Sequence, residues 1–263
     1  MLCSTLMKKG VESKHFLSDI RQLSDWYSSS LGQMLAYEEQ QELDRILPDL
    51  FGYHILQMGT VEPSLLDASR ILHKVVLGYE QSGYRQKNLV GEQEHLPILP
   101  DCIDTVMLHH SLDFANDPRQ VLRETERVLV PEGHVIILGF NPRSLWGLRR
   151  LLSVGRKSAP WNGRLLTVNR VKDWLALLGF ETMATHYRFF RPPFGRSVMS
   201  GHMKFMERWG AKLWPILGGV YILVGRKKVS TLTPIKPRWR PNKSIVPGLG
   251  DAASRSCKRN GTS

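Results

Sequence analysis

Polar side chains directly follow two short apolar runs of the sequence, at 87–90 and 104–108, and they are the first candidates for chemistry. These side chains are Glu92, Gln93, His95, His109, His110 and Asp113. A carboxylate can accept hydrogen bonds from an amine, and a histidine can act as a base. The three histidines lack the spacing of a metal-ligand set, so we expect no metal site.

The apolar pattern around these residues predicts alternating strands and helices. We expect strands at 54–58, 74–77, 87–90, 104–108 and 134–139, and helices at 64–72 and 118–130. This alternation builds parallel strands through crossover helices and predicts a three-layer α/β fold. In such a sheet, ligands bind at the carboxyl ends of the strands, so the polar side chains would share one edge.

Further elements flank the alternating segment. We expect an amphipathic helix that ends before Pro48, a helix that continues to Leu152, a helix at 171–178, and strands at 182–188 and 220–226. Asn141 would cap the second of these helices, with Pro142 in its first turn. We expect this helix to pack its leucine face on the sheet. Alternatively, its flanking arginines would make it a lid over an anionic ligand.

The formal net charge of +12 lies mostly at the C-terminal end of the chain. Residues 226–263 contain ten Lys or Arg and a single acid, Asp251, so residues 1–225 are close to neutral. Past Lys228 the sequence is poor in apolar residues and rich in Pro, Ser, Lys and Arg, which predicts disorder. We therefore expect a helical extension at 1–50, the α/β domain at 51–228 and a disordered basic tail at 229–263.

Composition and cysteine usage narrow the class of protein. With 42% hydrophobic and 23% charged residues, the chain is neither collagen-like, nor a coiled coil, nor wholly disordered. Cys3, Cys102 and Cys257 form no CxxC pair, which argues against a disulfide framework or structural zinc and favours a reducing cytoplasm. We expect a cytoplasmic protein, since the N-terminus lacks a signal-like apolar run and 213–224 is too short to cross a bilayer.

Three longer runs contain or follow the candidate residues. They read Gly91-Glu92-Gln93-Glu94-His95-Leu96-Pro97-Ile98, Asp104-Thr105-Val106-Met107-Leu108-His109-His110-Ser111-Leu112-Asp113-Phe114, and Val121-Leu122-Arg123-Glu124 followed by Arg127-Val128-Leu129-Val130-Pro131-Glu132-Gly133. Their order and spacing resemble class I S-adenosylmethionine-dependent methyltransferases, specifically the type-11 methyltransferase domain. The resemblance is good from Gly91 to Phe140 and implies a Rossmann-like, mainly parallel sheet with an antiparallel final strand.

The resemblance also implies S-adenosylmethionine as cofactor and suggests residue roles. Glu92 would accept a hydrogen bond from the adenine amino group, and the backbone amide of Gln93 would meet the adenine ring. His110 and Asp113 would face the place where the methionine part and the methyl acceptor meet. If the acceptor is a hydroxyl, His110 could act as its base. Asn141 would either cap a helix or lie near the transferred methyl group.

Two neighbouring residues of the same runs are given structural roles. Asp104 is expected to be structural, at the start of a strand. His109 is expected to be a packed neighbour of His110, because adjacent strand residues point to opposite faces of a sheet.

The glycine-rich loop expected after the first strand departs from the family pattern. It reads Gly59-Thr60-Val61-Glu62-Pro63, so only the first glycine is kept. Glu80 is the nearest counterpart of the acid that holds the ribose hydroxyls in relatives. We therefore carry Gly59 and Glu80 as cofactor-binding candidates beside Glu92, Gln93 and His110.

Three functions follow from these patterns. The first is a methyltransferase that acts on an unidentified acceptor, which needs orientation of the reactants and few catalytic groups. The second is a catalytically degenerate methyltransferase fold that acts as a binding module. The third is nucleic-acid binding, such as RNA contacted through the basic tail, where Trp239 could stack on a base. A solvated tail without a nucleic-acid partner is the alternative to the third.

Overall fold

The computed structural model describes residues 18–19, 21–59, 65–78, 88–152, 162–190 and 217–228. The chain divides into two compact units, Met1–Val229 and Ser230–Ser263, and every element named below belongs to the first. The predicted tail, Glu80 and the loop residues 60–63 lie outside the described residues.

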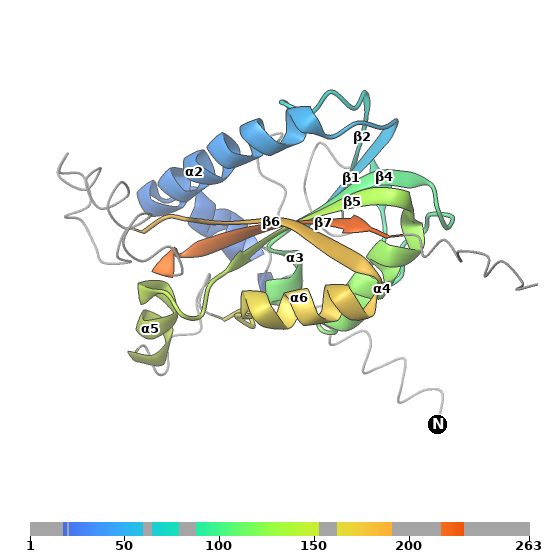
Figure 1. Ribbon diagram of the computed structural model, residues 1–263. Coiled ribbons are helices and arrows are strands. Elements are labelled where there is room, and N and C mark those ends of the chain that lie inside the picture. Colours follow the sequence, from blue (N-terminus) through green and yellow to red (C-terminus); the bar gives the residue numbers. More distant parts are fainter. Residues whose placement is uncertain are drawn as a thin grey trace, which may run out of the picture. The chain divides into compact units, whose positions relative to one another are not determined.

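A seven-stranded sheet forms the centre of the first unit, in the order β3-β2-β1-β4-β5-β7-β6 (Figure 1). The strands are β1 His54–Gly59, β2 His73–Gly78, β3 Leu89–Val90, β4 Ile103–His109, β5 Leu129–Phe140, β6 Phe180–Arg188 and β7 Val220–Lys227. The strands β1 to β5 pair in parallel, and β7 runs antiparallel to both β5 and β6. The predicted Rossmann-like sheet with an antiparallel final strand is therefore confirmed.

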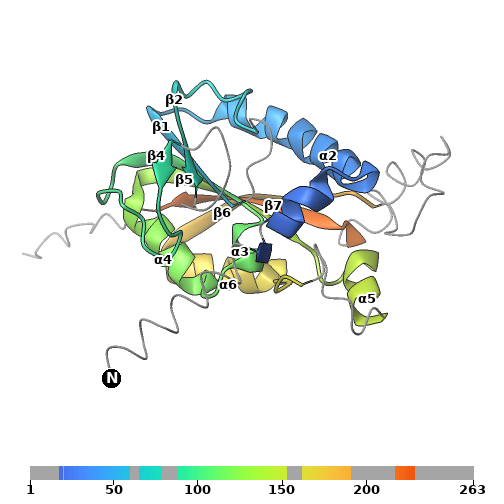
Figure 2. The same cartoon turned by 180° about the vertical axis from the view of Figure 1, so that it is seen from behind.

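Helices cover both faces of this sheet. They are α2 Ser30–Ile46, α3 Ser111–Phe114, α4 Pro118–Val128, α5 Leu145–Leu152 and α6 Val168–Leu177, with a 3-10 turn at Leu47–Asp49. The long helix α2 lies on one face, and α3, α4 and α6 lie on the other (Figures 1 and 2). The fold thus has the predicted three layers.

The apolar run of β5 faces both outer layers. Val135 and Ile137 belong to the core beneath α4 and α6, whereas Ile136 and Leu138 pack with Leu43 of α2. A parallel strand covered on both sides needs apolar residues at successive positions, which explains the absence of alternation in this run.

The expected helix at 64–72 is wrong within the described part. Residues 65–68 form a turn, and residues 69–71 carry no helix. The hydroxyl of Ser69 accepts a hydrogen bond from the Ile71 amide, which closes a local turn that competes with a helix. Leu66 and Ile71 are nevertheless buried in the core. The apolar residues of this segment therefore indicated burial correctly, but their spacing did not indicate a helix.

Two other boundaries differ from expectation. The helix predicted to reach residue 130 ends at Val128, and β5 begins at Leu129, because Pro131 disfavours helix before it. The cap of α5 is Ser144, whose Oγ accepts hydrogen bonds from the amides of Trp146 and Gly147. Asn141 caps no helix; its Oδ1 accepts from the Arg143 amide and its Nδ2 donates to the Gly218 carbonyl.

The helix α2 brings an unusual polar pair into the core. Ser29 caps it by accepting a hydrogen bond from the Gly32 amide, and its last residue is Ile46, two before Pro48 as predicted. The buried side chains of α2 include Leu35 and Leu43 but also Glu39 and Glu42. Two buried carboxylates on an apolar stripe require partners, and these partners define the site described next.

No helix among the described residues is long and apolar enough to cross a membrane.

Candidate functional site

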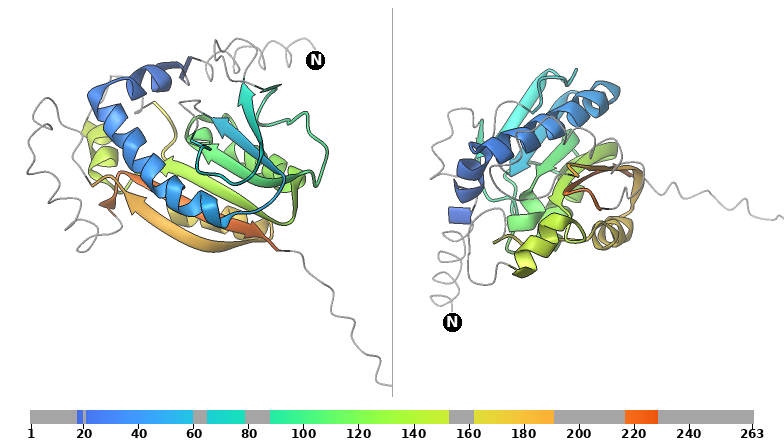
Figure 3. Two further views of the ribbon diagram at one scale, coloured as in Figure 1. Left: turned by 90° about the horizontal axis from the view of Figure 1, so that it is seen from above. Right: turned by 90° about the vertical axis from the view of Figure 1, so that its left-hand side faces the viewer.

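The carboxyl ends of four parallel strands meet at one edge of the sheet. Gly59 ends β1 and pairs in register with His109 at the end of β4. Next to β1, Gly78 ends β2 and pairs with Val90 at the end of β3. This edge is where ligands bind in open parallel sheets. The helix α2 crosses over β5 and β7 (Figure 3, left).

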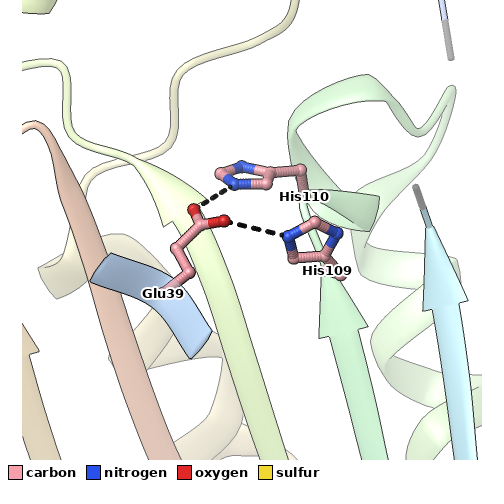
Figure 4. A group of neighbouring side chains, drawn as sticks. All are labelled: Glu39, His109 and His110. Carbon is pink, nitrogen blue, oxygen red and sulfur yellow. Dashed lines mark hydrogen bonds and ion pairs between the residues drawn. The ribbon is translucent and has the colours of Figure 1, made fainter. Parts of the chain in front are cut away.

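A buried carboxylate on α2 meets two histidines at this edge. Glu39 Oε1 lies 2.9 Å from His110 Nε2, and Glu39 Oε2 lies 3.2 Å from His109 Nε2. Tyr27 donates its hydroxyl to Glu39 Oε2 at 3.0 Å. Both imidazole rings point toward the carboxylate (Figure 4). Glu39 and His110 are both 0% exposed, so the cluster is shielded from bulk solvent.

The backbone of His110 explains how two adjacent histidines reach one carboxylate. His109 is in extended strand conformation, but His110 has φ 51° and ψ 17°, in the left-handed region. A non-glycine residue there costs roughly 1–3 kcal/mol and persists only where its surroundings fix it. This turn brings both rings to the same side, so the expectation that His109 points to the opposite face is wrong.

Asp113 completes the cluster from the other side of the His110 ring. His110 Nδ1 lies 3.1 Å from Asp113 Oδ2, and the same oxygen accepts a hydrogen bond from the Phe140 amide at 2.9 Å. The ring of Phe140 stacks on His110 at a centroid distance of 4.1 Å. His110 therefore lies between two carboxylates and links α2, the start of α3 and the end of β5.

Electrostatics make this array an internal ion pair. Burial alone would lower the pKa of His110, but the charge of Glu39 and the hydrogen bonds that His110 donates to both carboxylates outweigh it and raise the pKa to about 9. Burial would raise the pKa of Glu39, but the positive charge of His110 and hydrogen bonds from both histidines hold it at about 2. At neutral pH His110 is thus a cation and Glu39 an anion.

The side chains of the cluster are of the types that bind metal ions. Glu39, His109 and His110 place three such atoms within 4.8 Å of one another, which is a spacing that a metal ion could use. Hydrogen bonds already join all three atoms, and both nitrogens of His110 are taken by carboxylates. In the described structure these residues form a hydrogen-bonded network.

The adenine candidates lie on a turn after β3. His95 donates its amide to the Glu92 carbonyl, and the Glu92 side chain is 63% exposed. Gln93 is buried, and its Oε1 accepts a hydrogen bond from the Ser111 hydroxyl. Since Ser111 directly follows His110, this bond ties the turn to the histidine cluster.

The end of β1 requires glycine at position 59, because the backbone there has a positive φ and lies close to β4. Its φ of 109° is in the region that favours glycine, and a Cβ at this position would collide with the carbonyl oxygen of His109. Asp104, at the other end of β4, accepts hydrogen bonds from the amides of Tyr53 and His54 at 2.9 Å, which confirms its structural role.

Sequence reasoning missed Glu39. The signal was available, because Glu39 lies four residues after Leu35 and four before Leu43, on the buried stripe of the predicted helix. An acid at such a position needs a buried partner.

Comparisons with known proteins agree with this architecture. The family model described as "Methyltransferase domain" matches residues 66–137, which span β2 to most of β5. The Escherichia coli K12 protein named "Uncharacterized protein YafS" is 30% identical over 239 residues, covering 89% of this chain and 92% of that protein. The chain belongs to the class I S-adenosylmethionine-dependent methyltransferase family. The cofactor of this methyltransferase family is S-adenosylmethionine.

Solved methyltransferase structures share the fold. A Thermotoga maritima S-adenosylmethionine-dependent methyltransferase, described as a possible histamine N-methyltransferase, matches with a TM-score of 0.62 at 18% identity, over 82% of this chain and 99% of that one. A putative methyltransferase in complex with the Haloferax volcanii activator Trm112 is described in another structure, which matches with a TM-score of 0.56 at 15% identity, over 80% and 98% of the two chains. These likenesses show that the chain shares the fold of these proteins over about four fifths of its length.

Proposed function

We propose that the chain transfers a methyl group from S-adenosylmethionine to an acceptor still to be identified, with the cofactor at the carboxyl ends of β1 to β4. The arrangement of Gly59, Gln93 and His110 carries this proposal. These residues come from three separate segments, yet Gly59 contacts the backbone of His109 and Gln93 is bonded beside His110. The described cofactor candidates thus lie at one edge.

The residues at this edge fit the chemistry of the cofactor. The exposed carboxylate of Glu92 can only accept hydrogen bonds when ionised, as the exocyclic amine of adenine requires. The Glu39–His110 ion pair lies beside the carboxylate of Asp113, and carboxylates near the cofactor would favour its cationic sulfonium. Glu80, the ribose candidate, lies outside the described residues and stays a prediction.

When bound, S-adenosylmethionine would supply an electrophilic methyl group on a positively charged sulfur. The chain would hold the acceptor in line with the sulfur–carbon bond, and orientation alone can supply effective molarities of about 10⁵ M or more. His110 is cationic at neutral pH and both of its nitrogens are engaged, so a role as base requires release from Glu39 or Asp113. We therefore propose that His110 and Asp113 shape the site, and that the acceptor loses its proton elsewhere.

Calorimetric titration with S-adenosylmethionine and S-adenosylhomocysteine tests the proposal. We expect saturable binding of both compounds with one site per chain. The matched control is adenosine, which lacks the methionine part and should bind more weakly. The absence of heat and of a thermal shift at millimolar ligand would favour the second function, a degenerate methyltransferase fold that acts as a binding module.

The cytoplasmic location and RNA binding through the tail stay predictions from the sequence. The first is supported by the scattered cysteines and the second by the ten basic residues of 226–263.

A further inference from the structure

We infer that Glu39 is a positioning residue of the cofactor site, which fixes the β4–α3 junction through His110 and thereby the turn that carries Glu92 and Gln93. This inference rests on the proposed function and deepens it. It makes α2, which precedes the first strand of the sheet, a part of the site.

Glu39 and Asp113 fix the geometry at His110. Its left-handed backbone is the point where the chain leaves β4 and enters α3. Glu39 holds one nitrogen of the ring at 2.9 Å and Asp113 holds the other at 3.1 Å. Without Glu39, the ring keeps its hydrogen bond to Asp113 and its stacking on Phe140, but it loses the hydrogen bond to α2 that opposes relaxation of the strained backbone.

Ser111 connects His110 to the turn that carries Gln93. Ser111 is the residue after His110, and its hydroxyl donates to Gln93 on the turn after β3. Gln93 and Ser111 are both buried, so this hydrogen bond forms without competition from water. A change in the His110 backbone therefore moves Ser111 and, through it, the turn.

Several titratable groups set the charge environment of His110. The titratable groups around the cluster are Glu39 of α2, Tyr27 of the helical residues 21–27 before it, His109 of β4, Asp113 of α3 and Tyr221 of β7. Glu39 and Asp113 are the carboxylates that contact the ring. Removal of the Glu39 charge must therefore make the proton on His110 easier to lose.

The test compares Glu39→Gln with Glu42→Gln in the full chain. Glu42 is the matched control because it is also buried on α2, but it pairs with Arg188 at 2.6 Å and with His186. We expect Glu39→Gln to weaken S-adenosylhomocysteine binding about tenfold at pH 7 and to move the alkaline loss of binding to lower pH. Glu42→Gln should leave both unchanged.

Nuclear magnetic resonance of the histidine and glutamine side chains gives a readout independent of cofactor binding. Glu39→Gln should lower the titration midpoint of His110 and shift the Gln93 side-chain amide, and Glu42→Gln should do neither. If the parent chain binds no cofactor but the Gln93 signal still moves in Glu39→Gln alone, the positioning role stands and the proposed function falls. An unmoved Gln93 signal in Glu39→Gln would overturn the positioning role.

A second variant tests the inference even if Glu39→Gln does not fold. Ser111→Ala breaks the link to Gln93 while leaving the Glu39–His110 pair in place. It should reproduce the loss of affinity without lowering the midpoint of His110. Unchanged affinity in Ser111→Ala, or a stoichiometric divalent ion in the purified parent chain, would contradict the inference, because an ion would occupy the nitrogen that Glu39 holds.

Discussion

Glu39 and His110 are 71 positions apart in the sequence, yet their side chains form a completely buried ion pair with Oε1 and Nε2 separated by 2.9 Å. One partner lies on the long helix that precedes the first strand, and the other lies where β4 ends, at the edge of the sheet where we propose that the cofactor binds. Burial of two charges is costly unless each is paired and hydrogen-bonded, and this pair has further bonds from Tyr27 and Asp113. The helix α2 is thus fixed to the site by charge as well as by its leucines.

This pair makes stability depend on pH at both ends. The pKa of His110 rises from 6.5 to about 9 on folding, so its contribution is complete below pH 6.5 and is lost as the pH rises through about 9. The pKa of Glu39 falls from 4.5 to about 2, so its contribution is complete above pH 4.5 and is lost as the pH falls through about 2. Denaturant unfolding across pH should show the greatest contribution between pH 4.5 and 6.5.

Glu39→Gln should flatten both limbs of this profile, because it removes the acid and the charge that raises the pKa of His110. Glu42→Gln is expected to lower stability without flattening them, since Glu42 pairs with Arg188. Parallel profiles for the parent and Glu39→Gln would show that the pair does not govern the pH dependence.

Gly59→Ala should destabilise the fold by roughly 2 kcal/mol or more, because the added Cβ meets the His109 carbonyl oxygen and the left-handed φ strains alanine. Gly179→Ala is the matched control, since its φ is 83° but the nearest atom to its Cβ would be 3.9 Å away. That control should cost only about 1 kcal/mol. Thermal unfolding measures the loss of stability in both variants. Equal losses would mean that the contact between Gly59 and the His109 carbonyl does not add to the cost of the Gly59→Ala substitution.

The sequence predicted the sheet well because parallel strands buried on both faces leave continuous apolar runs. The run 135–138 is an example, and its residues face α2 on one side and α4 and α6 on the other. The prediction of a helix at 64–72 failed because Leu66 and Ile71 are buried although their segment forms a turn and no helix. Burial alone does not distinguish a turn from a short helix. Local hydrogen bonding at Ser69 decided the conformation.

The site was predicted only in part. His110 and Asp113 were expected at the strand end, and the structure places them there with Gly59 and Gln93 nearby. Glu39 was not predicted, because its contact with His110 depends on how α2 crosses the sheet, which no local pattern specifies. His109 is the packed neighbour of His110 that we expected, but the predicted direction of its side chain was wrong, because alternation of strand residues fails where the next residue has a positive φ.

Removal of residues 229–263 should lower the isoelectric point and leave cofactor binding unchanged. The described elements all lie in the unit Met1–Val229, which is compact without the tail. Isoelectric focusing and calorimetry measure the two effects. If RNA binds through the tail, truncation should also abolish retention of RNA at low salt, since phosphate contacts depend on basic side chains. Unchanged retention would remove the tail from consideration as a nucleic-acid site.

Glu92→Ala should weaken binding of S-adenosylmethionine about tenfold or more, which corresponds to the loss of one hydrogen bond to a charged group. Glu94→Ala is the matched control: it lies two residues away on the same turn, but its Oε1 accepts a hydrogen bond from the Asp117 amide at the cap of α4. It should lower thermal stability slightly and leave affinity unchanged. Calorimetry at pH 7 measures affinity for both variants. Equal affinities of Glu92→Ala and the parent would mean that adenine is held by backbone groups of the turn alone.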